Sequence, residues 1–147
     1  MSDLSQIVKA YDVRGVVPDQ LNESVARALG TAFVEMLRES GDDGDRIVIA
    51  HDMRESGPGL AAAFAAGANA AGAEVIHIGL ASTDQLYYAS GALDLPGAMF
   101  TASHNPAQYN GIKLCRAGAR PVGQDSGLAV VRRHAEELLG DLAAVAD

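Results

Sequence analysis

The alternation of short β-branched runs with longer segments of helical periodicity constrains the fold more than any other feature of this sequence. The expected strands are 46–50, 74–78, 95–100 and 112–115. The expected helices, each with apolar residues along one face, are 22–39, 56–71, 82–89 and 126–139. Strands that alternate with helices of this length imply βαβ units. The sequence therefore predicts an α/β fold, a three-layer α/β/α domain with a mostly parallel (mixed) sheet of about four strands.

The chain has the length of a single domain, and we assign residues 1–147 to one domain with one hydrophobic core. Its first part, residues 7–17, mixes short apolar pieces with Gly15 and stops before Pro18, which predicts a strand or the start of a hairpin.

Charge and composition exclude several classes of partner. The net charge of −8 argues against nucleic acid, which needs a basic face. No apolar stretch is long enough to span a membrane, and the first residues are acidic and polar where a signal peptide would be basic and apolar. With Cys115 as the single cysteine, neither an internal disulfide nor a cysteine-based zinc site can form. We therefore expect a cytoplasmic protein without nucleic-acid or membrane partners.

The loop that follows the third expected strand, TASHNPAQYNGIK at 101–113, concentrates polar and turn-forming residues. Gly111 and the asparagines tolerate backbone conformations that turn N–H groups inward, as anion-binding nests require. Ser103 is a candidate nucleophile toward phosphorus, with Lys113 close enough in sequence to share its site. By composition alone, an ordinary surface turn is the better interpretation, because the same residue types dominate turns.

Four motifs in a consistent order favour a functional loop over an ordinary surface turn. Residues 101–106 carry T-A-S-H-N-P, the signature of the α-D-phosphohexomutase family, and 109–113 match the Y-N-G-(F/I/Y)-K that follows it. Residues 9–15 resemble the family's (F/K)-A-Y-D-I-R-G element, and 51–54 resemble its G-x-D-x-R element. Order and spacing agree across most of the chain, which therefore resembles the N-terminal domain of the bacterial phosphomannomutase/phosphoglucomutase group.

The resemblance implies a chemistry. In the family, the serine carries a phosphoryl group and donates it to a hexose 1- or 6-phosphate; a bisphosphorylated sugar forms, reorients and returns its other phosphate. By resemblance Ser103 is the donor and acceptor, Arg14 holds the phosphate, and Lys113 acts as general base or acid toward the sugar hydroxyl. His104 orders the loop or donates to phosphate oxygens.

The resemblance also implies a set of residues that bind substrate or phosphate. They are Tyr11, Asn105, Asn110, His51 and Arg54. His51 and Arg54 are expected to bind or orient around the serine loop, although a structural salt bridge explains Arg54 nearly as well.

The family binds Mg²⁺ through the serine phosphate, here on Ser103, and three aspartates of a D-x-D-x-D-R loop in a second domain. We reject residues 43–46 (DGDR) as that site, because they lack the third aspartate and precede the serine loop. Hexose 1,6-bisphosphate is the implied activator, and hexose phosphates and the remaining domains of the enzyme are the implied partners. Since those domains are absent, the chain is expected to be an excised domain or fragment that is inactive alone.

Several alternatives stay open. Ala50 replaces a glycine, and Asp84 stands where the family often has proline, which leaves the subfamily open. The K-A-Y-D-V-R-G opening favours mannose/glucose mutases over a phosphoglucosamine mutase domain. A sugar-phosphate-binding module without turnover is a second reading. A serine hydrolase using Ser103 is the weakest, because the chain has no G-x-S-x-G elbow.

Overall fold

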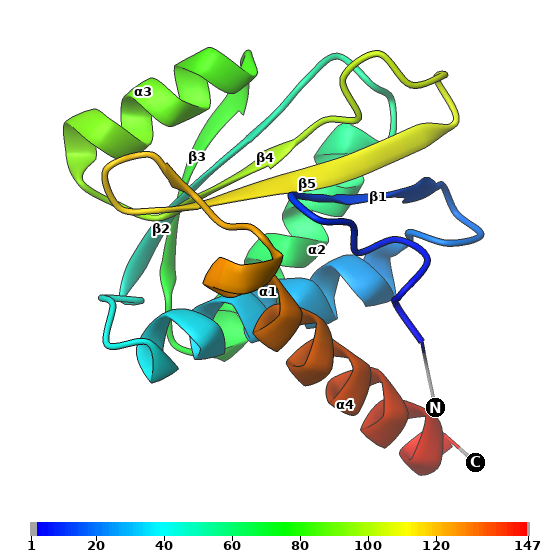
Figure 1. The fold of residues 1–147 in the computed structure, drawn as a ribbon. Coiled ribbons are helices and arrows are strands. Elements are labelled where there is room, and N and C mark those ends of the chain that lie inside the picture. Colours follow the sequence, from blue (N-terminus) through cyan, green and yellow to red (C-terminus); the bar gives the residue numbers. More distant parts are fainter. Residues whose placement is uncertain (1–2, 147) are drawn as a thin grey trace.

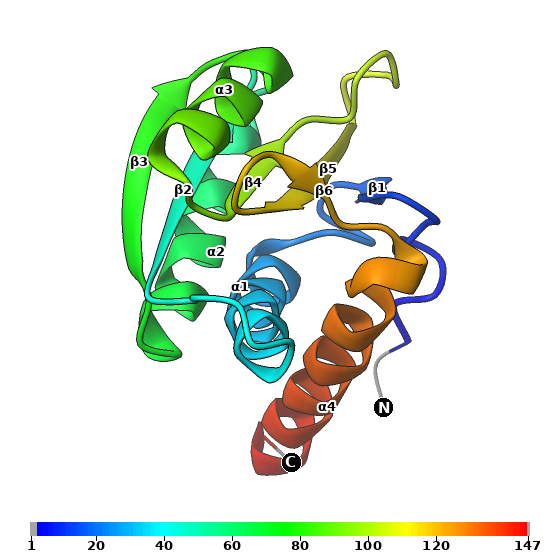
Figure 2. The ribbon, with the colours of Figure 1, turned by 60° about the vertical axis from the view of Figure 1, so that its left-hand side comes forward.

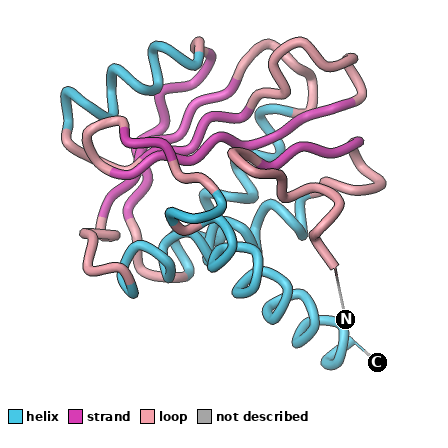
Figure 3. The backbone as a smooth tube through the Cα atoms, viewed as in Figure 1, coloured by secondary structure: helices cyan, strands magenta, loops and turns pink. Residues whose placement is uncertain are grey.

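A mixed six-stranded sheet separates two layers of helices in the computed structural model, which describes residues 3–146 (Figures 1 and 3). The elements in chain order are β1 (Val13–Val16), α1 (Glu23–Glu39), β2 (Arg46–His51), α2 (Gly57–Ala70), β3 (Glu74–Leu80), α3 (Thr83–Leu93), β4 (Gly97–Phe100), β5 (Tyr109–Arg116), β6 (Arg120–Pro121), the 3₁₀ turn η1 (Gln124–Ser126) and α4 (Leu128–Ala146). All four expected helices and all four expected strands are present; most ends lie within four residues of those expected, whereas α4 runs seven residues further, to Ala146.

The strand order is β1-β5-β4-β2-β3, with β6 beside β5. β2 pairs in parallel with β3 and β4, whereas β5 pairs antiparallel with β4, β1 and β6. The predicted α/β fold with a mixed sheet is confirmed, but the strand count of about four was too low. β6 has only two residues, too short to leave a pattern, and β1 lies in the 7–17 segment, which forms a hairpin through the Val8–Val13 bridge.

The two faces of the sheet carry cores of different size. Helices α1, α2 and α4 cover one face of the sheet (Figure 2). In the larger core on that face, the Phe64 ring packs edge-on against Phe100 and lies tilted against Phe33. Helix α3 covers the other face over a smaller core that contains Met99 and Cys115. Burial raises the pKa of the Cys115 thiol, so this side chain behaves as a small apolar residue. The predicted three-layer arrangement is therefore present.

Helices α1 and α2 cross at two glycines. A Cβ atom on Gly67 would lie 1.9 Å from the carbonyl oxygen of Arg27, and one on Gly30 would lie 2.0 Å from that of Phe64. At the same crossing, the Thr31 hydroxyl donates to the Gly67 carbonyl oxygen at 2.7 Å. The backbones approach so closely that only glycine fits, and this contact fixes α1 against α2.

The topology directs polar loops to one edge of the sheet. β2 and β4 are parallel neighbours, so the loops after His51 and Phe100 leave from the same edge. The loop after Phe100 leads into β5, next to the end of β1. This edge, at the carboxyl ends of the parallel strands, is where α/β folds bind ligands. Within residues 3–146, no helix is both long and apolar enough to cross a membrane.

Candidate active site

The serine loop, residues 101–108, joins β4 to β5 and presents Ser103 to solvent. The φ angle of Ser103 is 54°, in the left-handed region that residues other than glycine rarely adopt. Its backbone N–H donates to Thr101 Oγ1 at 3.0 Å. A residue holds such a conformation only where its surroundings fix it, and residues of this kind cluster at functional sites.

Arg54 supplies that fixation. Its Nη1 donates to the carbonyl oxygens of Pro106 (2.8 Å) and Tyr109 (2.9 Å). Its Nη2 donates to those of Ser103 (3.0 Å) and Asn105 (2.8 Å). The side chain is 9% exposed, and its Nε lies 3.5 Å from Asp52 Oδ2. The Arg54 guanidinium thus donates hydrogen bonds to three carbonyl oxygens of the serine loop and to that of Tyr109 at the start of β5, so Arg54 orients the serine loop.

A pocket of about 320 Å³ lies against Ser103. Its lining residues are Lys9, Ala10, Tyr11, Asp12, Arg14, Ser103 and Lys113. The antiparallel register pairs Arg14 of β1 with Gly111 of β5. A Cβ on Gly111 would lie 2.9 Å from Arg14 Cγ, so glycine there leaves room for the arginine side chain. The structure therefore brings the predicted residues Ser103, Lys113, Arg14 and Tyr11 to one pocket.

A second pocket of about 660 Å³ is lined by other residues of the serine loop and also includes Ser103. His104 and Asn105 line it, as does Arg54. The volume suits a ligand the size of a sugar phosphate. A further hollow of about 500 Å³, at the N-terminal ends of α1 and α2, contains none of the predicted site residues.

Two predicted residues are not brought to these pockets. The side chain of Asn110 is fully buried, and its amide donates to Ser56 Oγ at 2.8 Å, which joins β5 to the start of α2. His51 ends β2, with Nδ1 3.0 Å from the Asp52 carbonyl oxygen, and lines neither pocket. The Asn110 side chain therefore has no exposed surface in this structure, and its hydrogen bond holds β5 against the start of α2.

Comparison with known proteins settles the family. The family described as "Phosphoglucomutase/phosphomannomutase, alpha/beta/alpha domain I" matches residues 5–139. The chain belongs to this family. The chain is 47% identical over 125 residues to "Phosphohexose mutases" of Xanthomonas campestris pv. campestris, covering 84% of this chain and 27% of that protein. It is 42% identical over 130 residues to a "Phosphomannomutase" of Klebsiella pneumoniae, covering 88% of this chain and 80% of that protein.

Solved structures agree. A phosphoglucomutase/phosphomannomutase family protein of Burkholderia thailandensis superposes with a TM-score of 0.83 at 34% identity, over 93% of this chain and 31% of that one. A putative phosphomannomutase of Thermus thermophilus gives 0.78 at 29% identity, over 86% of this chain and 29% of that one. The chain thus spans less than a third of these structures and about a quarter of the Xanthomonas relative.

Two residues of the smaller pocket, Asp12 and Lys9, were not among the site residues predicted from the sequence. Asp12 is 8% exposed, a buried charge that binary patterning does not reveal. Its spacing from Arg14 was the available signal, because residues two apart on a strand share a face. Lys9 stands at the start of the turn whose tip exposes Tyr11, closed by the Lys9 N–H donating to the Asp12 carbonyl oxygen at 2.8 Å.

Proposed function

We propose that this chain is the phosphoserine-bearing domain of a phosphomannomutase/phosphoglucomutase, which interconverts hexose 1-phosphate and hexose 6-phosphate. The observation that carries the proposal is that Ser103, Arg14 and Lys113 line one pocket. Arg54 holds the backbone of the loop that bears Ser103. The family membership supports the same reaction.

The proposed step is an in-line transfer from phosphoserine to a sugar hydroxyl. The hydroxyl oxygen bonds to phosphorus, the bond between phosphorus and Ser103 Oγ breaks, and the proton of the hydroxyl ends on Oγ. Lys113 serves as general base or acid for that proton. Phosphoryl transfer depends chiefly on alignment and on neutralisation of charge, and the Arg14 guanidinium and Lys113 ammonium supply positive charge beside Ser103. His104, exposed beside Ser103, is placed to donate to phosphate or sugar oxygens.

Magnesium fits this chain poorly by itself. Among the side chains that the structure describes, residues 3–140, no three carboxylate, histidine or cysteine groups lie together as metal ligands. We propose that the chain's contribution to a Mg²⁺ site is the phosphate on Ser103, with the carboxylates supplied from outside residues 1–147. For the same reason we propose that the chain needs the other domains for turnover and is inactive alone, and that hexose 1,6-bisphosphate charges Ser103. The single-cysteine composition is consistent with a cytoplasmic enzyme.

Complementation tests this function. The chain is assayed with glucose 1-phosphate or mannose 1-phosphate, a hexose 1,6-bisphosphate primer and Mg²⁺, with and without the separately made remainder of a related enzyme. We expect turnover only in the mixture, and a loss of at least about 10³-fold in Ser103→Ala, because the group that carries the phosphate is removed. Ser24→Ala, an exposed serine on α1, is the matched control and should behave as the unsubstituted chain.

The outcomes separate the alternatives. Turnover that survives Ser103→Ala would overturn the proposal. Saturable binding of hexose phosphates without turnover, in a mixture whose remainder works with its own domain I, would identify a binding module. Preference for glucosamine 1-phosphate in a parallel assay would assign the phosphoglucosamine subfamily.

A further inference from the structure

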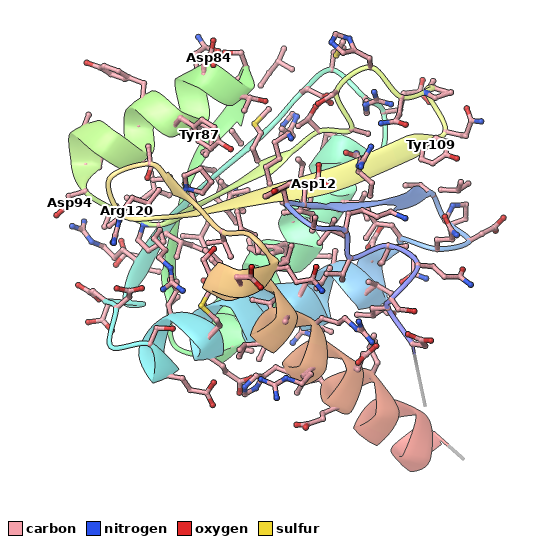
Figure 4. The ribbon with its side chains drawn as sticks, in the orientation of Figure 1. Asp12, Asp84, Tyr87, Asp94, Tyr109 and Arg120 are labelled. Atoms are coloured by element: carbon pink, nitrogen blue, oxygen red, sulfur yellow. The ribbon has the colours of Figure 1, made fainter. Side chains whose placement is uncertain are left out.

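The carboxylate of Asp12 lies between two of the three cations of the smaller pocket, Arg14 and Lys113. Its Oδ1 is 3.2 Å from Arg14 Nε, and its Oδ2 is 3.4 Å from Lys113 Nζ. Figure 4 places Asp12 at the start of β1, beside β5. The register pairs Val13 with Ile112, so the residue before Val13 falls opposite Lys113. The contact with Lys113 is therefore built into the pairing of β1 with β5.

This carboxylate fixes the direction of both cations. The Asp12 side chain is 11% exposed, and a charge so far from water is stable only when it is paired. Each oxygen takes one partner, which orients the Lys113 ammonium from one side. Arg14 is held through Nε, and within the described residues its terminal nitrogens have no protein partner. Those nitrogens are left for an anion in the pocket.

The charges in the pocket come close to balancing a phosphoserine. Lys9, Arg14 and Lys113 contribute three positive charges and Asp12 one negative charge, which leaves a net charge of +2 (3 − 1). A phosphoserine carries about −1.5 to −2 at neutral pH. Without Asp12, the same cations would exceed the charge of the phosphate, and the dianion would be held more tightly on Ser103.

We propose that Asp12 is a positioning residue for phosphoryl transfer. It aims Lys113 Nζ and the Arg14 guanidinium at Ser103 and limits the positive charge of the pocket, so that a phosphate is bound without being trapped. The inference rests on the proposed function for its consequence in turnover, whereas the orientation of Lys113 and the charge of the pocket are properties of the chain alone.

The chain alone allows a direct spectroscopic test, because Lys9 and Lys113 are its only lysines. In lysine-labelled protein, the two Hε protons of an immobilised side chain have different NMR shifts, and those of a freely rotating side chain coincide. We expect separate Hε shifts for Lys113, assigned with Lys9→Arg, and their collapse in Asp12→Asn. Inorganic phosphate should bind Asp12→Asn about tenfold more tightly, since a nearby negative charge is gone. Asp125→Asn is the matched control, because this exposed carboxylate lines a different hollow, one that shares only Ala10 and Tyr11 with the smaller pocket. It makes the same charge change and should alter neither the Lys113 shifts nor the phosphate affinity.

Turnover gives the second test. In the complementation assay, we expect Asp12→Asn to lower kcat about 10²-fold through misplaced cations, with KM unchanged or lower. Damage to the fold alone would weaken phosphate binding instead. If Asp12→Asn does not fold, Asp12→Glu keeps the charge but changes the reach, and should retain phosphate affinity while altering the Lys113 signal.

Unchanged Lys113 shifts together with unchanged phosphate affinity in Asp12→Asn would overturn the inference. Unchanged kcat in an active mixture would also overturn it. Absence of turnover in the unsubstituted mixture would count against the proposed function, and the two readouts on the isolated chain would still decide the role of Asp12.

Discussion

Arg54→Lys is expected to release the serine loop and to lower phosphoryl transfer in the complementation assay by about 10²- to 10³-fold. The planar guanidinium reaches four carbonyl oxygens through two nitrogens. A lysine ammonium is a single point with three donors and cannot reproduce that fork. The carbonyls left without a donor, with Asp52 deprived of its ion pair, should also lower the free energy of unfolding by about 2–4 kcal/mol.

Three measurements check the Arg54 substitution: urea denaturation, amide hydrogen exchange of residues 101–110 and turnover of the mixture. Exchange of the loop amides should accelerate while the strands stay protected, since the change is local. Arg46→Lys, at the exposed start of β2, is the matched control and should change none of the three. Arg54→Lys with wild-type loop protection and wild-type turnover would show that Arg54 does not hold Ser103 in place.

Gly67→Ala is expected to cost at least about 3 kcal/mol of unfolding free energy, because the new methyl group would meet backbone rather than a movable side chain. The nearest atoms are the carbonyl oxygen of Arg27 at 1.9 Å, its carbon at 2.8 Å and the Thr31 nitrogen at 3.1 Å. Helices α1 and α2 would have to separate, which also breaks the Thr31–Gly67 hydrogen bond. A domain of this size has only about 5–15 kcal/mol of stability, so much of the chain should be unfolded under mild denaturant.

Gly91→Ala provides a control of opposite sign. Gly91 lies in α3, and a Cβ there meets no atom within 4 Å. Alanine in a helix should stabilise by up to about 1 kcal/mol relative to glycine. Chemical denaturation of both variants measures the difference, and a Gly67→Ala midpoint equal to that of the unsubstituted chain would contradict the close crossing of α1 and α2.

The periodic parts of the fold were predictable from the sequence, and the irregular parts were not. The helix expected over 22–39 followed from its apolar face and forms as α1, where Asn22 caps the start because its Oδ1 accepts from the Val25 N–H at 3.0 Å. β6 has two residues and owes its place to β5, so no local pattern announced it. β5 runs antiparallel to both β4 and β1, and its pairing with β1 joins segments about one hundred residues apart, which no local pattern reveals.

The site divides in the same way. Motifs located Ser103, Arg14 and Lys113, and the structure gathers them at one pocket. A sequence motif does not distinguish a residue that faces a ligand from one that supports the loop, because the motif records the residue type and not the direction of its side chain. Asn110 is thus buried against Ser56, and Arg54 turns its guanidinium to carbonyls of the loop. Asp12 was not predicted, because its contact with Lys113 depends on the pairing of β1 with β5 and not on a local pattern.

We propose that Ser103 carries the phosphoryl group, and the direct test of this proposal is to map the phosphoryl group on the chain. The active mixture is incubated with hexose 1,6-bisphosphate, and the chain is recovered and fragmented in a mass spectrometer. We expect one acid-stable phosphoryl group on Ser103, which is lost on addition of excess hexose phosphate and absent from Ser103→Ala. An acid-labile group on His104, or turnover with no phosphoryl group on the chain, would contradict it.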